Sequence, residues 1–182
     1  MNALMQSDLL IVGAGTAGIP AAIFAARRGA GVVLAEATDS PDGTLRRAAG
    51  HVSAGGTRLQ MARGIVDDPA AHAADIMRIT KGTADAAMVT RACELAPGVV
   101  AWLDELGMEW DPTCPAILHG LETYSVPRTY WGTQKGKSIA AVMRPELERE
   151  IDAGTVTFCP EISLVSLDRA GGVVKGGTFV NS

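Results

Sequence analysis

Three glycines near the N-terminus have the spacing of a phosphate-binding turn. Gly13, Gly15 and Gly18 follow a short apolar run, Leu9 to Val12, in the pattern Gly-x-Gly-x-x-Gly. The first glycine of this pattern permits a tight turn, the second lets the backbone approach a pyrophosphate, and the third lets a helix pack closely on a strand. The helix that follows directs free N–H groups and the positive end of its dipole at the phosphates. The residues predicted to bind here are Gly13, Gly15, Thr16, Ala17 and Gly18.

An acidic residue closes this unit at the end of a second predicted strand. Val32 to Ala35 is a short apolar run, and Glu36 follows it, 18 residues after Gly18. A carboxylate there can accept hydrogen bonds from both hydroxyls of an adenosine ribose, and it would repel the 2′-phosphate of NADP. Strand, glycine turn, helix, strand and acid in this order predict a dinucleotide site, to which Ala37 also belongs. This segment alone does not separate FAD from NAD.

The segment from Thr38 to Gly56 is rich in glycine and small residues, with turn signals at Pro41 to Gly43. Such a segment can lie flat against a planar ligand and offer it backbone N–H groups. A flexible surface loop is the alternative interpretation. The position directly after the predicted ribose-binding acid favours the ligand-binding one.

Polar aromatic and basic residues gather in a second loop, from Asp111 to Gly136, which prolines and glycines interrupt. Loops carry catalytic and binding residues more often than cores do. We therefore consider Tyr124, Arg128 and Tyr130 as substrate-side candidates, with Arg128 able to grip a carboxylate. Packing and hydrogen bonding within the loop are an equally good explanation for all three.

The remaining pattern alternates strands and helices around these segments. Asp68 and Pro69 are typical of a helix start, and Gly107 of a left-handed helix end. Val99, Trp102, Leu103 and Leu106 are spaced as one buried helix face. The predicted helices cover about 69–80, 85–95, 97–106 and 138–151; a strand covers 155–158, and a hairpin pairs 162–167 with 173–180.

Composition sets limits on the partners and the compartment. The 182 residues can bury a real core as one domain, and the net charge of −4 gives no reason to expect nucleic acid. No apolar run approaches the about 20 residues that span a bilayer, and the first residues lack the features of a signal peptide. The three cysteines are widely spaced and predict neither a zinc site nor a disulfide framework. We therefore expect a cytoplasmic protein without a membrane span.

Taken together, these segments resemble the flavoprotein family of fumarate reductase, succinate dehydrogenase, L-aspartate oxidase and 3-ketosteroid dehydrogenase. The likeness lies in VGAGTAGIPAAIFAARRGAGVVLAE, in GTLRRAAGHVSAGG, in GTRLQMARGIVDDP with LAPGVVAWLDELGMEWD, and in PRTYWGTQKGKSIAAVMRPEL with the hairpin LVSLDRAGGVVKGG. Together these stretches cover nearly the whole chain. The resemblance implies FAD as the cofactor and a Rossmann-like α/β fold with a parallel sheet, added helices and a β-hairpin.

The resemblance also assigns roles to single residues. It implies that Gly43 and Thr44 meet a phosphate, that Ala49 and Gly50 lie against the flavin, and that Ile162 faces the adenine. Succinate dehydrogenases carry a flavin-linked histidine six residues before the glycine pair of this segment, and Thr44 stands at that position here. We therefore expect non-covalent FAD. His51 replaces the second glycine of the pair and is either a proton donor beside the flavin or a tolerated side chain.

Members of this family are much longer than 182 residues. The strand that should follow the hairpin, the capping domain and the last FAD motif are not in this sequence, so we expect residues 1–182 to be the N-terminal part of an FAD-binding domain. A second polypeptide is then expected to complete the sheet and supply the substrate domain, unless the chain is a fragment. The resemblance implies hydride transfer at a carbon of a small-molecule substrate next to a carbonyl or carboxylate. A non-catalytic FAD-carrying subunit and an NAD-binding Rossmann subunit are the alternatives.

Overall fold

The computed structural model describes residues 4–118 and 123–182. The chain forms two compact units. The first, called the sheet unit, comprises Met1–Arg46 and Met143–Ser182, and the second, called the helical unit, comprises Arg47–Val142. Each unit has its own core and is described by itself.

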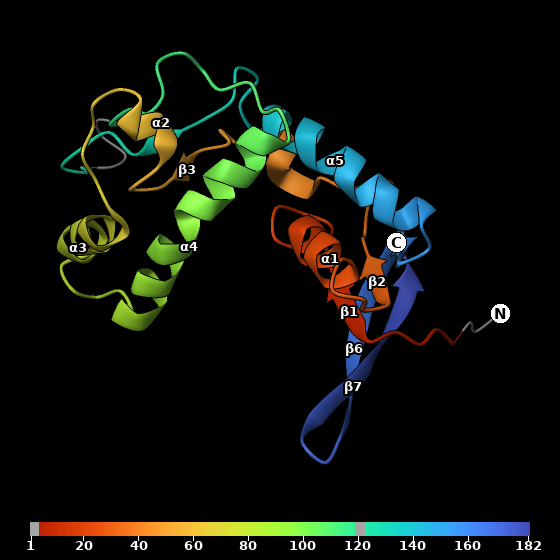
Figure 1. The fold of residues 1–182 in the computed structure, drawn as a ribbon. Helices are drawn as coiled ribbons and strands as arrows, with labels where there is room; N and C mark the ends of the chain where they lie inside the picture. Colours follow the sequence, from red (N-terminus) through yellow and green to blue (C-terminus); the bar gives the residue numbers. More distant parts are fainter. Residues whose placement is uncertain (1–3, 119–122) are drawn as a thin grey trace. The chain divides into compact units, whose positions relative to one another are not determined.

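A three-stranded parallel sheet organises the sheet unit (Figure 1). Its order is β1 (Leu9–Val12), β2 (Val32–Ala35), β5 (Val156–Cys159), with Leu9 opposite Val32 and Val32 opposite Val156. Every residue of β2 is buried, as a central strand requires. Strand β1 is an edge strand in the described part of the chain, and Leu9 and Val12 are exposed.

Helix α1 (Gly18–Ala26) packs on β1 and β2. Its buried residues include Ile19 and Ile23, which are spaced one helical turn apart. Arg27, at the C-terminal end of α1, forms ion pairs with Glu146 and Glu150 of α5 (Gly136–Asp152). These ion pairs join two helices that come from distant parts of the sequence.

The predicted hairpin is present and somewhat longer than expected. Strands β6 (Ile162–Ala170) and β7 (Val173–Asn181) pair antiparallel and form the blue ribbon of Figure 1. A Cβ at Gly177 would lie 2.6 Å from Leu164 Cδ1, so glycine lets an apolar side chain cross the strand there. The hairpin forms a separate two-stranded sheet in the described residues.

The helical unit contains α2 (Arg58–Met61), α3 (Pro69–Ile79), α4 (Ala86–Glu105) and a short antiparallel pair, β3 (Val52–Ser53) with β4 (Thr129–Tyr130). The predicted start of α3 is confirmed, since Asp68 Oδ1 accepts a hydrogen bond from Ala71 N at 2.7 Å. The core of this unit consists of Ala54, Val100, Cys114 and Tyr130, with Val52, Leu59, Ala96, Trp110 and Trp131 packed against it.

Two boundaries predicted from the sequence are wrong. Residues 86–105 form one helix with Pro97 inside it, where two helices were expected. Helix α5 begins at Gly136, two residues before Ser138, and the Ser138 hydroxyl instead accepts a hydrogen bond from Gln134 N at 3.0 Å. Gly107 has the expected left-handed conformation, with a φ of 84°.

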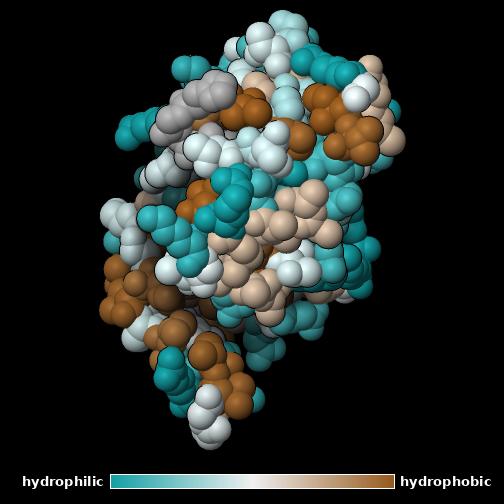
Figure 2. Space-filling model, turned by 90° about the vertical axis from the view of Figure 1, so that its left-hand side faces the viewer, coloured by the Kyte–Doolittle hydropathy of each residue, from teal (hydrophilic) through white to brown (hydrophobic). Residues whose placement is uncertain are grey.

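Helix α4 is long and apolar enough to cross a membrane by length and composition. It also carries Arg91 and Glu94 and packs along α3. Large apolar side chains reach the molecular surface at several places, as the brown patches of Figure 2 show. Leu9, Val12, Met88, Leu95, Val99, Val165 and Val173 are among them.

Candidate nucleotide-binding site

The three glycines of the predicted turn meet different steric demands. A Cβ at Gly18 would lie 1.8 Å from the carbonyl oxygen of Gly13, so only glycine lets α1 begin this close to β1. Gly13 has a φ of 97°, in the left-handed region that favours glycine. A Cβ at Gly13 or Gly15 would meet no atom within 4 Å among the described residues. The turn therefore leaves open space on the side where a phosphate would approach the backbone.

The N-terminus of α1 fits an anion. Among the described residues, no side chain caps its first turn and no acidic residue lies within it. The N–H groups at the start of a helix and the helix dipole both attract negative charge. Because the turn offers space and the helix offers positive potential, this part of the chain fits the pyrophosphate of a dinucleotide.

The carboxylate of Glu36 lies beside the same turn. Its Oε2 accepts a hydrogen bond from Ala14 N at 2.7 Å, and its Oε1 accepts hydrogen bonds from the Thr38 N–H and hydroxyl, both at 2.9 Å. Burial alone would raise the pKa of Glu36, but these hydrogen bonds hold it below its ordinary value. The side chain is therefore an ionised acceptor at the end of β2, the place where a ribose diol is bound in this kind of fold.

The Thr38 hydroxyl has a second acceptor within reach, the carbonyl oxygen of Ser40 at 3.0 Å. A hydroxyl carries one proton and can donate it to only one of the two. Turning toward Ser40 would release a lone pair of Glu36 for a ribose hydroxyl. The Glu36 carboxylate can thus have its hydrogen bonds both with and without a bound ribose, and the backbone need not move.

Asp42 was not singled out from the sequence, yet it supports the glycine turn. Asp42 is buried, and its N–H donates to the carbonyl oxygen of Ala14 at 2.9 Å. Its carboxylate pairs with Arg46 and Arg144. Asp42 has a φ of 124°, which is unusual for a residue other than glycine, and this backbone conformation marks it as a special position of the turn. The sequence gives no sign of that conformation.

The remaining predicted contacts in the sheet unit lie close to Glu36 and the turn. Ile162 N donates to the carbonyl oxygen of Glu36 at 3.0 Å, which places the start of β6 next to this acid. A Cβ at Gly43 would lie 3.5 Å from Gly15 Cα, so η1 (Gly43–Arg47) begins against the glycine turn. Ala37 and Thr44 are both exposed. Their contacts with a cofactor stay predictions.

The predicted flavin-side residues belong to the helical unit. Gly50 has a φ of 67°, and a Cβ there would lie 2.4 Å from Gly136 N, so the segment with Ala49 packs backbone to backbone on the start of α5. His51 is exposed, and its ring meets the ring of Trp131 edge-on at 5.5 Å. The residue is accessible, as a proton donor must be.

Arg128, considered from the sequence as a substrate-binding cation, is fully buried. Its guanidinium donates to both carboxylate oxygens of Asp67 at 2.7 Å and also to Asp75. Asp75 further accepts hydrogen bonds from Ser125 and Arg78. These contacts fit the alternative interpretation of Arg128, packing and hydrogen bonding within the loop. A role of Arg128 in substrate binding stays a prediction.

Both tyrosine candidates also contact neighbours in the helical unit. The Tyr130 hydroxyl bonds to the Thr57 hydroxyl inside the core, and burial raises the pKa of Tyr130 to about 12. The Tyr124 ring lies edge-on to the His72 ring at 5.2 Å, and the Arg128 guanidinium lies 5.6 Å from its centroid. Of the four catalytic candidates, His51 is the most accessible.

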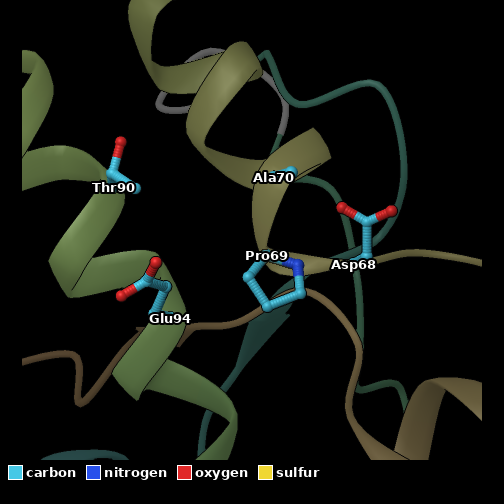
Figure 3. A pocket seen from close by; sticks show the side chains of 5 residues that line it. All are labelled: Asp68, Pro69, Ala70, Thr90 and Glu94. Carbon is cyan, nitrogen blue, oxygen red and sulfur yellow. The ribbon is translucent and has the colours of Figure 1, made fainter.

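The described part of the helical unit also has an open hollow of about 360 Å³ between α3 and α4, lined by Asp68, Pro69, Ala70, Thr90 and Glu94 (Figure 3). The carboxylates of Asp68 and Glu94 would repel a phosphate, and the mostly apolar walls would offer it few hydrogen bonds. None of the predicted nucleotide-binding residues lines it. We therefore assign the nucleotide to the glycine turn and not to this hollow.

Comparisons with known proteins indicate FAD as the nucleotide. The family model described as FAD binding domain matches residues 8–182. The flavoprotein subunit of an acrylate reductase from Shewanella woodyi is 31% identical over 93% of this chain, and a fumarate reductase (cytochrome) from Shewanella frigidimarina is 30% identical over 80% of it. The fold is that of a crystallised 3-ketosteroid-Δ4-(5α)-dehydrogenase from Rhodococcus jostii, with a TM-score of 0.75, 24% identity and coverage of 96% of this chain.

All three proteins are much longer than this chain. The matched region is 33% of the acrylate reductase subunit, 25% of the fumarate reductase and 43% of the ketosteroid dehydrogenase chain. The likeness therefore covers less than half of each of these proteins.

Proposed function

Because the chain belongs to the family of FAD binding domains, we propose that it is the FAD-holding part of a flavin-dependent oxidoreductase. The observation that carries the proposal is the pairing of the glycine turn with Glu36, whose ionised carboxylate is hydrogen-bonded to the turn itself at Ala14 N. The turn and the start of α1 would hold the pyrophosphate, and Glu36 would hold the adenosine ribose. FAD would be bound without a covalent link, since Thr44 stands where some relatives carry a histidine.

Bound FAD supplies hydride transfer at the flavin ring. The residues of this chain would bind and orient the cofactor. The names of three similar proteins support a proposal for the substrate class. They mention fumarate, acrylate and a 3-ketosteroid. Each has a carbonyl or carboxylate next to the carbons that react. We propose a substrate of this class, with His51 as the candidate proton donor and Tyr124, Arg128 and Tyr130 as further candidates.

The sheet supports the proposal that more polypeptide completes the enzyme. One side of β1 has no strand partner in the part of the chain that the structure describes, and the Leu9 and Val12 side chains of this strand are exposed. An open edge with apolar side chains is normally covered in a native protein. A second polypeptide, or a longer form of this chain, would supply the missing strand and the substrate domain.

The test is to isolate the tagged chain from its native cells, with whatever co-purifies, and alone after recombinant expression. Each preparation is examined for flavin absorbance and for dye-linked turnover of fumarate, acrylate and 4-androstene-3,17-dione. We expect flavin in both and turnover only in the native assembly. Turnover by the recombinant chain alone would contradict the incomplete enzyme. A yellow native assembly inert toward all three compounds would favour a non-catalytic FAD-carrying subunit.

A further inference from the structure

Helix α4 has an apolar face that the helical unit does not cover. Successive residues of a helix are turned by about 100°, so α4 divides into three faces. One face is buried in the unit and includes Cys93, Val100 and Leu103. A second is charged and exposed and includes Arg91, Glu94 and Glu105. The third, called the α4 seam, consists of Met88, Ala92, Leu95, Val99, Trp102 and Leu106.

The seam is exposed where a core would be expected. Met88 is 73% exposed, Leu95 50% and Val99 44%, while Trp102 and Leu106 are half-buried. From the sequence, Val99 belongs to a buried face with Leu103, yet the structure buries only Leu103 of that pair. The spacing of the seam alternates between four and three residues, which is the repeat of a helix that packs along another helix.

The seam is also symmetric about its middle. Met88 and Leu106 lie nine residues on either side of Pro97, Ala92 and Trp102 lie five, and Leu95 and Val99 lie two. In an antiparallel pair of α4 helices centred at Pro97, each of these residues would therefore face its counterpart on the other copy. The small Ala92 would meet the large Trp102, and Leu95 would meet Val99, so the two seams would interdigitate.

The residues beside the seam favour the same partner. Arg91 and Glu105 lie six and eight residues from Pro97, so in the antiparallel pair each Arg91 would come within about 3 Å along the axis of the other copy's Glu105. In the described part of the chain, Arg91 pairs with exposed Glu94, at 3.3 Å, a contact that contributes little. A Cβ at Gly98 would meet nothing within 4 Å among the described residues. The packing of this chain therefore does not require glycine at position 98. The absence of a side chain at Gly98 would let a second helix approach closely.

From these observations we infer that the α4 seam is a homodimer interface, in which two copies of this chain pair their α4 helices antiparallel about a two-fold axis at Pro97. Such an interface is isologous, with the same patch on both copies. One pair of helices buries less surface than the about 1,200 to 2,000 Å² of a standard interface. We therefore expect a reversible dimer with a dissociation constant in the micromolar range.

The first experiment measures the dimer of the full chain by sedimentation equilibrium over a wide concentration range. Leu95→Glu places a charge at the centre of the seam and is expected to weaken the dimer at least about tenfold. Val66→Glu is the matched control, because Val66 is 94% exposed in the same unit and lies outside α4. We expect this control to dimerise as the natural chain does.

A charge exchange tests the antiparallel register directly and does not depend on the folding of the Leu95 variant. Arg91→Glu and Glu105→Arg should each weaken the dimer, because each places like charges opposite one another. The double variant should restore dimerisation to within a few-fold of the natural chain, since the pairs are re-formed with reversed signs. Failure of the double variant to recover, while both single variants are weakened, would overturn this register.

A natural chain that stays monomeric at all concentrations would overturn the proposal. If that monomer instead co-floats with vesicles of phosphatidylcholine and phosphatidylglycerol, the seam binds lipid. Flavin absorbance recorded on the same samples keeps the two proposals apart. A yellow monomer would contradict only the dimer, and a colourless dimer would contradict only the FAD-holding function.

Discussion

At the scale of single residues, the account depends most on Glu36. Its carboxylate accepts three hydrogen bonds beside the glycine turn and is held ionised by them. We predict that Glu36→Gln weakens FAD binding at least about tenfold, because an amide offers one acceptor oxygen and no charge to the ribose and to Ala14 N. Titration of the flavin fluorescence with protein measures the change.

Asp39→Asn is the control for this substitution, since it removes the same charge three residues away at an exposed position. Its FAD affinity should be unchanged. Equal losses in both variants would mean that net charge, and not the position of Glu36, controls binding.

Two glycines of the turn should separate the cost of folding from the cost of binding. Gly18→Ala would force a Cβ into the Gly13 carbonyl, so we predict a loss of about 1 to 3 kcal/mol in the free energy of unfolding together with weaker FAD binding. Gly15→Ala meets no atom of the chain and should leave that free energy nearly unchanged while it weakens FAD binding. Urea unfolding and flavin titration of both variants check this. A Gly15→Ala variant with full FAD affinity would show that the phosphate does not approach Gly15.

At the scale of elements, Arg128 joins the loop before β4 to α3 through Asp67 and Asp75. Arg128→Met would remove the cation that pairs with buried Asp67 and one of the cations that pair with buried Asp75, which keeps Arg78. We predict a loss of about 3 to 5 kcal/mol in the free energy of unfolding of the helical unit. Arg91→Met, which breaks an exposed pair, should cost less than about 0.5 kcal/mol. Urea unfolding monitored by tryptophan fluorescence compares them, and similar losses would show that the buried pairs contribute no more than the exposed one.

The same network makes the helical unit sensitive to acid. Burial alone would raise the pKa of Asp75, but hydrogen bonds from Ser125 and the ion pairs with Arg78 and Arg128 hold it well below its usual range. The pKa of Asp67 is lowered by its bonds with Arg128 and Gln60, again against the effect of burial. A carboxyl with a lowered pKa in the folded state stabilises the fold above its unfolded pKa, and that stability is lost as the pH falls.

We therefore predict that the free energy of unfolding of this unit is constant near neutrality and falls steadily below about pH 4, the ordinary range of these carboxyls. Asp75→Asn should flatten this dependence while lowering the stability at neutral pH. Unfolding midpoints measured between neutral and acid pH test the prediction. A natural chain whose midpoint stays constant through this range would contradict it.

At the scale of the whole molecule, the sequence was most informative where a local pattern meets a steric demand. The glycine spacing, the Asp68 cap and the Gly107 helix end are all confirmed, because each depends on a few neighbouring residues. The edge position of β1 and the exposure of Val99 could not be read from hydropathy, since burial depends on which surfaces meet. The same limit hid Asp42, whose role follows from its backbone conformation and its distant partner Arg144.

The division into two units and the partial coverage of longer relatives have one common consequence. The glycine turn and Glu36, which we propose to hold the nucleotide, lie in the sheet unit, whereas the catalytic candidates lie in the helical unit. Binding of FAD and catalysis on a substrate can therefore be tested separately, the first with this chain alone.

The most direct test of the central claim is equilibrium titration of the purified, flavin-free chain with FAD, followed by flavin fluorescence and absorbance. The account predicts saturable binding of one FAD per chain, competition by ADP, and at least about tenfold weaker binding by the Glu36→Gln variant. A folded chain that remains colourless and shows no saturable change with FAD would contradict it.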